Sequence, residues 1–161
     1  MANKPLSLCF LTATWNRPAC LRRLIPQFFA QDYPTTDIEL LILDDSGQYV
    51  SECGDRGDGG HRWQLISFDR PFATLPQKMN AMLNMTDADG VVVFEDDDIF
   101  HPQHADACAA ALAIGDVSKP SRVLTHVHGV LKEEDASGRF HSSIAFRTEP
   151  IRNAGGWVQT K

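Results

Sequence analysis

Three short aliphatic runs, each stopped abruptly by polar residues, limit the folds that are open to this chain. The runs cover residues 6–13, 38–43 and 91–94. Runs of this length without polar alternation are typical of strands that are buried on both faces of a sheet. The sequence therefore predicts a buried sheet whose strands are followed by polar loops.

Segments with the apolar spacing of helices separate these runs. Apolar side chains recur at intervals of three and four over residues 18–32, and residues 75–85 and 102–114 also read as helices. Pro102 is expected in a first helical turn, where a missing backbone donor does no harm. With a further strand at residues 63–68, strands alternate with helices, which predicts an α/β fold of three α/β/α layers around a mostly parallel central sheet. Ligands of such sheets bind at the carboxyl ends of the strands.

The C-terminal third has a different pattern. Residues 123–131 and 140–146 read as two longer strands joined by a polar turn at 133–138, so we expect a C-terminal antiparallel hairpin. Residues 54–60 are polar and rich in glycine, which predicts a mobile surface loop. At 161 residues, the chain is expected to form a single domain over residues 1–161.

Charge and cysteine spacing exclude several classes of protein. Lys and Arg total 15 against 21 Asp and Glu, a net charge of −6, so no stable nucleic-acid binding is expected. The four cysteines form no C-x-x-C pair, and we interpret them as reduced thiols. We find neither a secretory signal pattern nor the run of roughly 20 apolar residues that a transmembrane helix needs. A soluble, cytoplasmic protein is the resulting expectation.

Four consecutive acidic residues, Glu95–Asp98, directly follow the third aliphatic run. Adjacent carboxylates repel one another unless a cation offsets their charge, and Mg²⁺ and Mn²⁺ prefer carboxylate oxygens. We therefore predict a divalent metal site at this strand end. The alternative is a solvated acidic loop that favours the dipole of the helix expected at Pro102.

Two histidines give a weaker indication of a metal site. His126 and His128 lie two apart on an expected strand, so that both would face the same side and could hold a metal between them. The alternative, which we prefer, is a pair of polar residues on a half-exposed strand face.

Four sequence segments together resemble a known family. They are TATWNRP after the first run, LDDSG after the second, the K-x-N of LPQKMNAMLN, and VVVFEDDDIFHP. Their order and spacing resemble those of the GT-A glycosyltransferases, particularly family 2, over nearly the whole chain. The resemblance implies the GT-A nucleotide-diphospho-sugar transferase fold.

The resemblance also implies a set of donor-binding residues in two loops. In that family the loops after the first two strands grip the base and ribose of the nucleotide. The positions that correspond in the first loop are Thr12, Ala13, Thr14 and Arg17. In the second loop, Asp45 is expected beside the base, whereas Asp44 is expected to orient the loop.

The resemblance assigns a third donor-binding position and the metal ligands. Lys78 corresponds to a basic residue near the diphosphate, and its alternative interpretation is an ordinary solvated lysine. The D-x-D motif of the family corresponds to Glu95, Asp96 and Asp97. We expect Asp97 on the metal first of all, with Asp96 and Asp98 as further ligands. Glu95 departs from the usual aspartate, and Asp96 is also a candidate to bind a ribose or sugar hydroxyl.

The implied activity is the transfer of a sugar from a nucleoside-diphosphate donor, with UDP-sugars favoured, to an acceptor hydroxyl. Mn²⁺ or Mg²⁺ would stabilise the leaving diphosphate, and inversion would need a carboxylate base. The family pattern predicts Gly155, Gly156 and Trp157, which are present, followed by a Glu-Asp pair, which is absent. Glu149 is the nearest acidic residue, yet it matches no catalytic position of the family.

Several alternatives for function remain open at the level of sequence. The chain could be a non-catalytic module that binds a sugar nucleotide and metal, or a partial domain that needs a partner. The acceptor could be a glycan, a lipid, a protein or a modified base, and homo-oligomers are possible. A nucleotidyltransferase is disfavoured because TATWNRP contains no glycine for a phosphate loop, and a phosphatase with an Asp nucleophile is disfavoured because TATWNRP contains no Asp.

Overall fold

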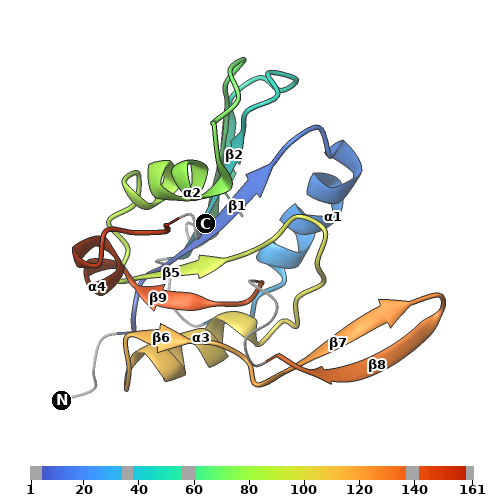
Figure 1. The fold of residues 1–161 in the computed structure, drawn as a ribbon, viewed down its shortest axis with the longest axis vertical. Coiled ribbons are helices and arrows are strands. Elements are labelled where there is room, and N and C mark those ends of the chain that lie inside the picture. The colour runs from blue at the N-terminus through green and yellow to red at the C-terminus, as the bar shows by residue number, and fades with distance from the viewer. Residues whose placement is uncertain (1–4, 34–37, 56–60, 137–141, 159–161) are drawn as a thin grey trace.

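The computed structural model describes residues 5–33, 38–55, 61–136 and 142–158. Within these ranges, one sheet contains seven strands in the order β3-β4-β2-β1-β5-β9-β6 (Figure 1). The strands are β1 Leu8–Thr14, β2 Ile38–Asp44, β3 Glu52–Asp55, β4 His61–Ser67, β5 Gly90–Val93, β6 Val117–Ser118 and β9 Ala145–Arg147.

The four central strands run parallel and end at a common edge. β1 pairs with both β2 and β5, and β2 pairs with β4. In this register Thr14 lies beside Asp44, and Asp44 lies beside Ser67. The outer strands β3, β9 and β6 are antiparallel to their neighbours. The sheet is therefore mixed rather than mostly parallel, because the predicted parallel core is extended by antiparallel strands at both edges.

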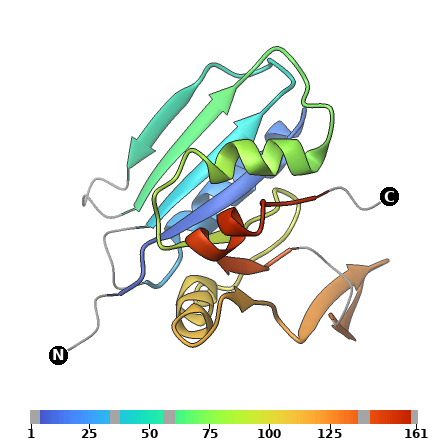
Figure 2. The ribbon, with the colours of Figure 1, turned by 60° about the vertical axis from the view of Figure 1, so that its left-hand side comes forward.

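Helices cover both faces of the sheet, which confirms the three-layer α/β/α prediction. On one face α1 (Pro18–Phe29) and α3 (His104–Leu112) pack against Phe10 and alternate residues of the strands. On the other face α2 (Leu75–Leu83) and α4 (Thr148–Asn153) pack against Leu11 and its neighbours. Figure 2 shows α2 and α4 in front of the sheet and α1 behind it. Two apolar cores result, because successive strand residues point to opposite faces.

The third helix begins later than predicted. α3 starts at His104, whereas Pro102 lies in the preceding turn. The carbonyl of Pro102 accepts a hydrogen bond from the amide of Asp32, which ties this turn to the end of α1. Pro102 therefore helps to join two elements instead of opening a helix.

An antiparallel hairpin is present in the C-terminal third, but its residues differ from those predicted. It consists of β7 (Arg122–Val127) and β8 (Val130–Asp135), with β9 belonging to the large sheet. His128 and Gly129 have φ values of 52° and 80°, and two such residues form the turn that best joins twisted strands. The prediction of one continuous strand over 123–131 is therefore wrong. The hairpin extends away from the large sheet in both views (Figures 1 and 2).

A short edge strand, β3, occupies part of the predicted loop at residues 54–60. Gly54 belongs to this strand, and a Cβ atom there would lie 2.6 Å from Nε1 of Trp63, so the close approach of the indole needs a glycine. Residues 56–60 lie outside the described residues. None of the helices in the described ranges has the length and apolar character that crossing a membrane requires.

Candidate functional site

A cleft of about 770 Å³ lies where β1 and β5 end and α2 begins. It is lined by residues from the loop after β1, from the start of α2, from the acidic segment after β5 and from the segment near the C-terminus. Of the residues predicted from the sequence, the structure places the following in its wall: Ala13, Thr14, Arg17, Lys78, Glu95, Asp96 and Asp97. The acidic segment is thus part of a shared cleft and not an isolated solvated loop.

Asp96 is the anchor of the acidic segment. The residue is only 2% exposed, and its carboxylate accepts hydrogen bonds from Oγ1 of Thr14 at 2.5 Å and from Nη1 of Arg17 at 2.9 Å. These bonds join the end of β5 to the loop that follows β1. Asp96 is consequently held in place before any ligand arrives.

Asp97 has the opposite character. Its side chain is 56% exposed, and its carboxylate accepts a 2.9 Å hydrogen bond from the same Nη1 atom of Arg17. The backbone carbonyl of Asp97 accepts a bond from Arg23 of α1. The backbone at this position is therefore fixed, whereas the carboxylate remains accessible from the cleft.

Lys78 is buried, so its interpretation as an ordinary solvated lysine is wrong. Its Nζ atom donates hydrogen bonds of 2.5 Å to the carbonyl oxygen of Thr14 and to Oδ1 of Asp45. Asp45 also accepts a bond from the amide of Phe72. Burial alone would raise the pKa of Asp45, but these hydrogen bonds and the charge of Lys78 outweigh burial, and the pKa lies below its usual value. The pair links the loops after β1 and β2.

Asp44 lies where a residue that orients the second loop is expected. It is fully buried and accepts hydrogen bonds from Oγ of Ser46 at 2.6 Å and from Oγ of Ser67 at 2.8 Å. Thr12 also plays an internal part, because its buried hydroxyl donates to the carbonyl of Phe94 and so joins β1 to the end of β5. Neither side chain lines the cleft.

The acidic segment carries more negative charge than its surroundings neutralise. Burial and then the neighbouring carboxylates of Asp98, Asp97 and Asp96 raise the pKa of Glu95 to about 7. Burial raises the pKa of Asp98 as well. Bringing positive charge to this segment would relieve the repulsion, and its all-oxygen donor set fits Mg²⁺ or Mn²⁺.

A cation at this segment would need ligands beyond the side chains of the described residues. Within the described ranges, no three His, Cys, Asp or Glu side chains are grouped so that they could hold a metal ion by themselves. Mg²⁺ commonly binds through one or two carboxylates and completes its coordination with water and phosphate oxygens. The exposed carboxylate of Asp97 suits such a partly open arrangement.

Asp45 and Asp98 do not line the cleft, and three further candidate residues lie away from it. Glu149 is exposed in α4, and the preceding residue, Thr148, donates its amide hydrogen to Asp89 just before β5 begins. Glu149 therefore lies toward the opposite end of β5 from the acidic segment. His126 is exposed on β7, whereas β7 ends at Val127 and His128 lies in the turn. The premise that both histidines face one side of a strand is wrong.

Two tryptophans that were not predicted as site residues line the cleft. Trp15, in the loop after β1, is 59% exposed. Trp157 packs against Phe146 and exchanges two hydrogen bonds with Asn80 of α2, at 2.8 Å and 2.9 Å. The K-x-N spacing and the Gly-Gly-aromatic segment contained the signal for Asn80 and Trp157, but their pairing depends on tertiary structure.

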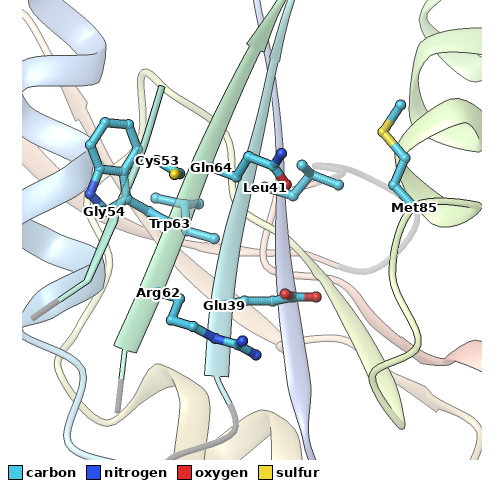
Figure 3. Close-up of a pocket in the computed structure, with 9 residues that line it drawn as sticks. Glu39, Leu41, Cys53, Gly54, Arg62, Trp63, Gln64 and Met85 are labelled. Carbon is cyan, nitrogen blue, oxygen red and sulfur yellow. The ribbon is translucent and has the colours of Figure 1, made fainter. Parts of the chain in front are cut away.

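A second cavity, of about 520 Å³, lies over β2, β4 and β3 on a stretch of the sheet beside Met85 (Figure 3). Glu39 and Arg62 lie beside each other on neighbouring strands at one end of it, and Cys53 and Gln64 line it further along. It contains none of the residues predicted to bind a donor or a metal. The candidate site is therefore the acidic cleft.

The layered fold, with its acidic cleft at the carboxyl end of the parallel strands, is the GT-A fold of glycosyltransferase domains. The chain belongs to glycosyl transferase family 2, whose sequence profile matches residues 9–144. No curated protein matches the chain.

Two solved structures show how far the fold is shared. The chain is similar to the mannosyltransferase PcManGT from Pyrobaculum calidifontis in complex with GDP-Man and Mn²⁺, with a TM-score of 0.65 and 14% identity over 97% of this chain and 48% of that one. It is also similar to residues 1–349 of TarS from S. aureus in complex with UDP-GlcNAc, with a TM-score of 0.68 and 14% identity over 93% of this chain and 48% of that one. The chain thus spans about half the length of these structures.

Proposed function

We propose that this chain binds a nucleoside-diphosphate sugar together with Mn²⁺ or Mg²⁺ and serves as the donor-binding part of a glycosyltransferase. The observation that carries the proposal is the cleft in which Thr14 and Arg17 bind Asp96 and Asp97. Lys78 joins this part of the cleft to Asp45, in the loop after β2. Family membership and the donor complexes of the similar structures support it.

The chain's own residues divide the work of donor binding. Asp97, with Asp96 beside it in the wall of the cleft, would hold the cation, which when bound stabilises the negative charge of the leaving nucleoside diphosphate. The exposed ring of Trp15 offers a surface on which a base can stack. The carboxylate of Asp45 offsets the positive charge of Lys78 in an ion pair. We therefore assign Lys78 to holding the two loops together and not to binding the diphosphate.

A non-catalytic sugar-nucleotide-binding module is the second candidate function. Among the described residues, the only carboxylates that line the cleft are those of Glu95, Asp96 and Asp97. An inverting transferase needs a further carboxylate base on the opposite face of the sugar, and Glu149 does not reach the cleft. We propose no residue of this chain for that role.

We also propose that the protein is cytoplasmic. All four cysteines are free, which is what a reducing compartment such as the cytoplasm would produce.

One pair of assays on the purified chain tests the function. Donor hydrolysis and sugar transfer are measured for UDP-GlcNAc and GDP-Man with Mn²⁺, while binding of UDP, GDP and dTDP is followed by calorimetry. A transferase domain shows metal-dependent nucleotide binding together with turnover, whereas a binding module shows the same binding with no turnover. Absence of binding for all three nucleotides, with and without Mn²⁺, would contradict both candidates.

A further inference from the structure

We infer that Arg17 acts as a built-in counter-cation for the acidic segment, and that a divalent metal ion must displace it from Asp97 in order to bind. The inference rests on the proposed function, because it concerns how the cation enters that site. Arg17 is then a positioning residue, which sets the affinity of the nucleotide-free cleft for a divalent metal ion.

The geometry places one guanidinium nitrogen between two carboxylates. Nη1 of Arg17 lies 2.9 Å from Oδ1 of Asp96 and 2.9 Å from Oδ2 of Asp97. A divalent cation shared by adjacent carboxylates would interact with these same acceptor groups. Both cations therefore compete for the carboxylate of Asp97.

The two carboxylates differ in how firmly they are held. Asp96 is buried and has a second donor in the hydroxyl of Thr14. Asp97 is 56% exposed. Among the described residues, the hydrogen-bond donor to its carboxylate is Arg17 alone. Displacement of Arg17 from Asp97 is the easier step, so Asp97 is the carboxylate that changes partner while Asp96 remains bonded to Thr14.

Arg17 is itself placed so that it can give up one contact. Its side chain is 51% exposed and lines the cleft, and the hydrogen bond to Asp96 raises its pKa further. When Asp97 is taken by a metal ion, the guanidinium still has Asp96 as a partner, and Arg17 still lines the cleft proposed to receive a diphosphate. Guanidinium groups suit phosphate oxygens through their forked donors.

A purely structural role for Arg17 predicts a different outcome. If the residue only ties the loop after β1 to the acidic segment, its removal disorders the segment and weakens metal binding or leaves it unchanged. If Arg17 competes with the metal, its removal strengthens metal binding in the absence of nucleotide. The sign of the change separates the two roles.

The test is direct titration of Mn²⁺ into the nucleotide-free chain, followed by electron paramagnetic resonance of the free ion. Arg17→Gln is expected to bind Mn²⁺ about tenfold more tightly than the wild type, equivalent to about 1.4 kcal/mol. Arg17→Lys keeps the charge but loses the planar fork, and we expect a smaller increase. Circular dichroism confirms that each variant is folded.

Arg23→Gln is the matched control. It removes the same charge from α1 close to the segment, but the guanidinium of Arg23 donates to the backbone carbonyl of Asp97 and not to its carboxylate. Its effect on Mn²⁺ affinity should stay below about threefold, since exposed charges contribute little at ordinary salt concentration. An equal gain in Arg17→Gln and Arg23→Gln would overturn the inference and point to net charge alone.

The remaining outcomes separate this inference from the proposed function. Unchanged or weaker Mn²⁺ binding by both Arg17 variants overturns the inference, whereas Mn²⁺ binding by the wild type in the presence of UDP or GDP would still support the proposed function. If no variant binds Mn²⁺ with or without nucleotide, the inference and the proposed function both fail.

Discussion

Lys78 and Asp45 form an ion pair whose side chains are only 6% and 9% exposed. Breaking a buried pair by removing one partner leaves an uncompensated charge, which is more destabilising than replacing both partners. Lys78→Met should therefore lower the free energy of unfolding by about 3 kcal/mol, measured by urea denaturation at pH 7. The double variant Lys78→Met/Asp45→Asn should recover part of the loss. A single variant as stable as the wild type would show that the pair does not fasten the two loops.

Glu95 gives a pH dependence of stability that can be isolated by mutation. Its pKa is raised to about 7 in the folded chain, so between about pH 4.5 and pH 7 the folded state holds a proton that the unfolded state has released. The contribution of Glu95 to the free energy of unfolding therefore falls as pH rises through this window.

Glu95→Gln should remove this fall, which we put at about 1 kcal/mol because the half-exposed group is partly screened by solvent. The measurement is urea denaturation at pH 5 and pH 7.5 with EDTA present. Glu149→Gln, an exposed carboxyl outside the cleft, is the control and should retain the wild-type dependence. Identical profiles for Glu95→Gln and the wild type would contradict the prediction.

Sequence alone located the acidic residues of the site but not the partners that hold them. Asp96 and Asp97 could be placed because they follow a buried strand directly, and strand ends gather at one edge of a sheet. The burial of Lys78 and the internal hydrogen bond of Thr12 could not be foreseen, because each depends on a partner more than 30 positions away along the chain.

At the level of elements, α2 and the C-terminal segment are held together by Asn80 and Trp157. A Cβ atom at Gly156 would lie 2.2 Å from Oδ1 of Asn80, and the residue has a φ of +76°. Gly155→Ala is a matched control, since Gly155 also has a positive φ but open space around the added atom.

Gly156→Ala should break both hydrogen bonds between Asn80 and Trp157 and release this side of the cleft. We expect it to be destabilising by about 1–3 kcal/mol more than Gly155→Ala, because both variants share the backbone strain and only one loses the contact. Tryptophan fluorescence and thermal unfolding measure the difference. Equal destabilisation by the two variants would show that the contact with Asn80 contributes nothing.

The secondary structure was predictable where the pattern of apolar residues was local. Residues 38–43 lie within β2, and residues 91–93 of the predicted run 91–94 lie within β5, because an uninterrupted aliphatic run can be buried only between two covering layers. The hairpin was misplaced because His128 and Gly129 form a turn inside a stretch that reads as one strand. The place of β9 in the main sheet, between β5 and β6, was also missed, since strand pairing is set by contacts that the sequence does not display.

At the scale of the whole molecule, the parallel strands direct the site to one edge of the sheet. The loops after β1 and β2 and the acidic segment after β5 all leave the sheet at its carboxyl edge, whereas α4 begins near the amino end of β5. This separation explains why Glu149 does not belong to the site and why the acidic segment does. Everything proposed for the donor depends on a divalent cation being shared there with a diphosphate.

The most direct measurement is calorimetric titration of UDP and GDP into the chain with and without Mn²⁺, comparing the wild type with Asp97→Asn and Asp87→Asn. Asp87 is an exposed acid just before β5, so its variant makes the same change of charge outside the cleft. We predict that Mn²⁺ strengthens nucleotide binding at least tenfold in the wild type and in Asp87→Asn, and that Asp97→Asn loses this increase. Undiminished Mn²⁺ dependence in Asp97→Asn would contradict the account.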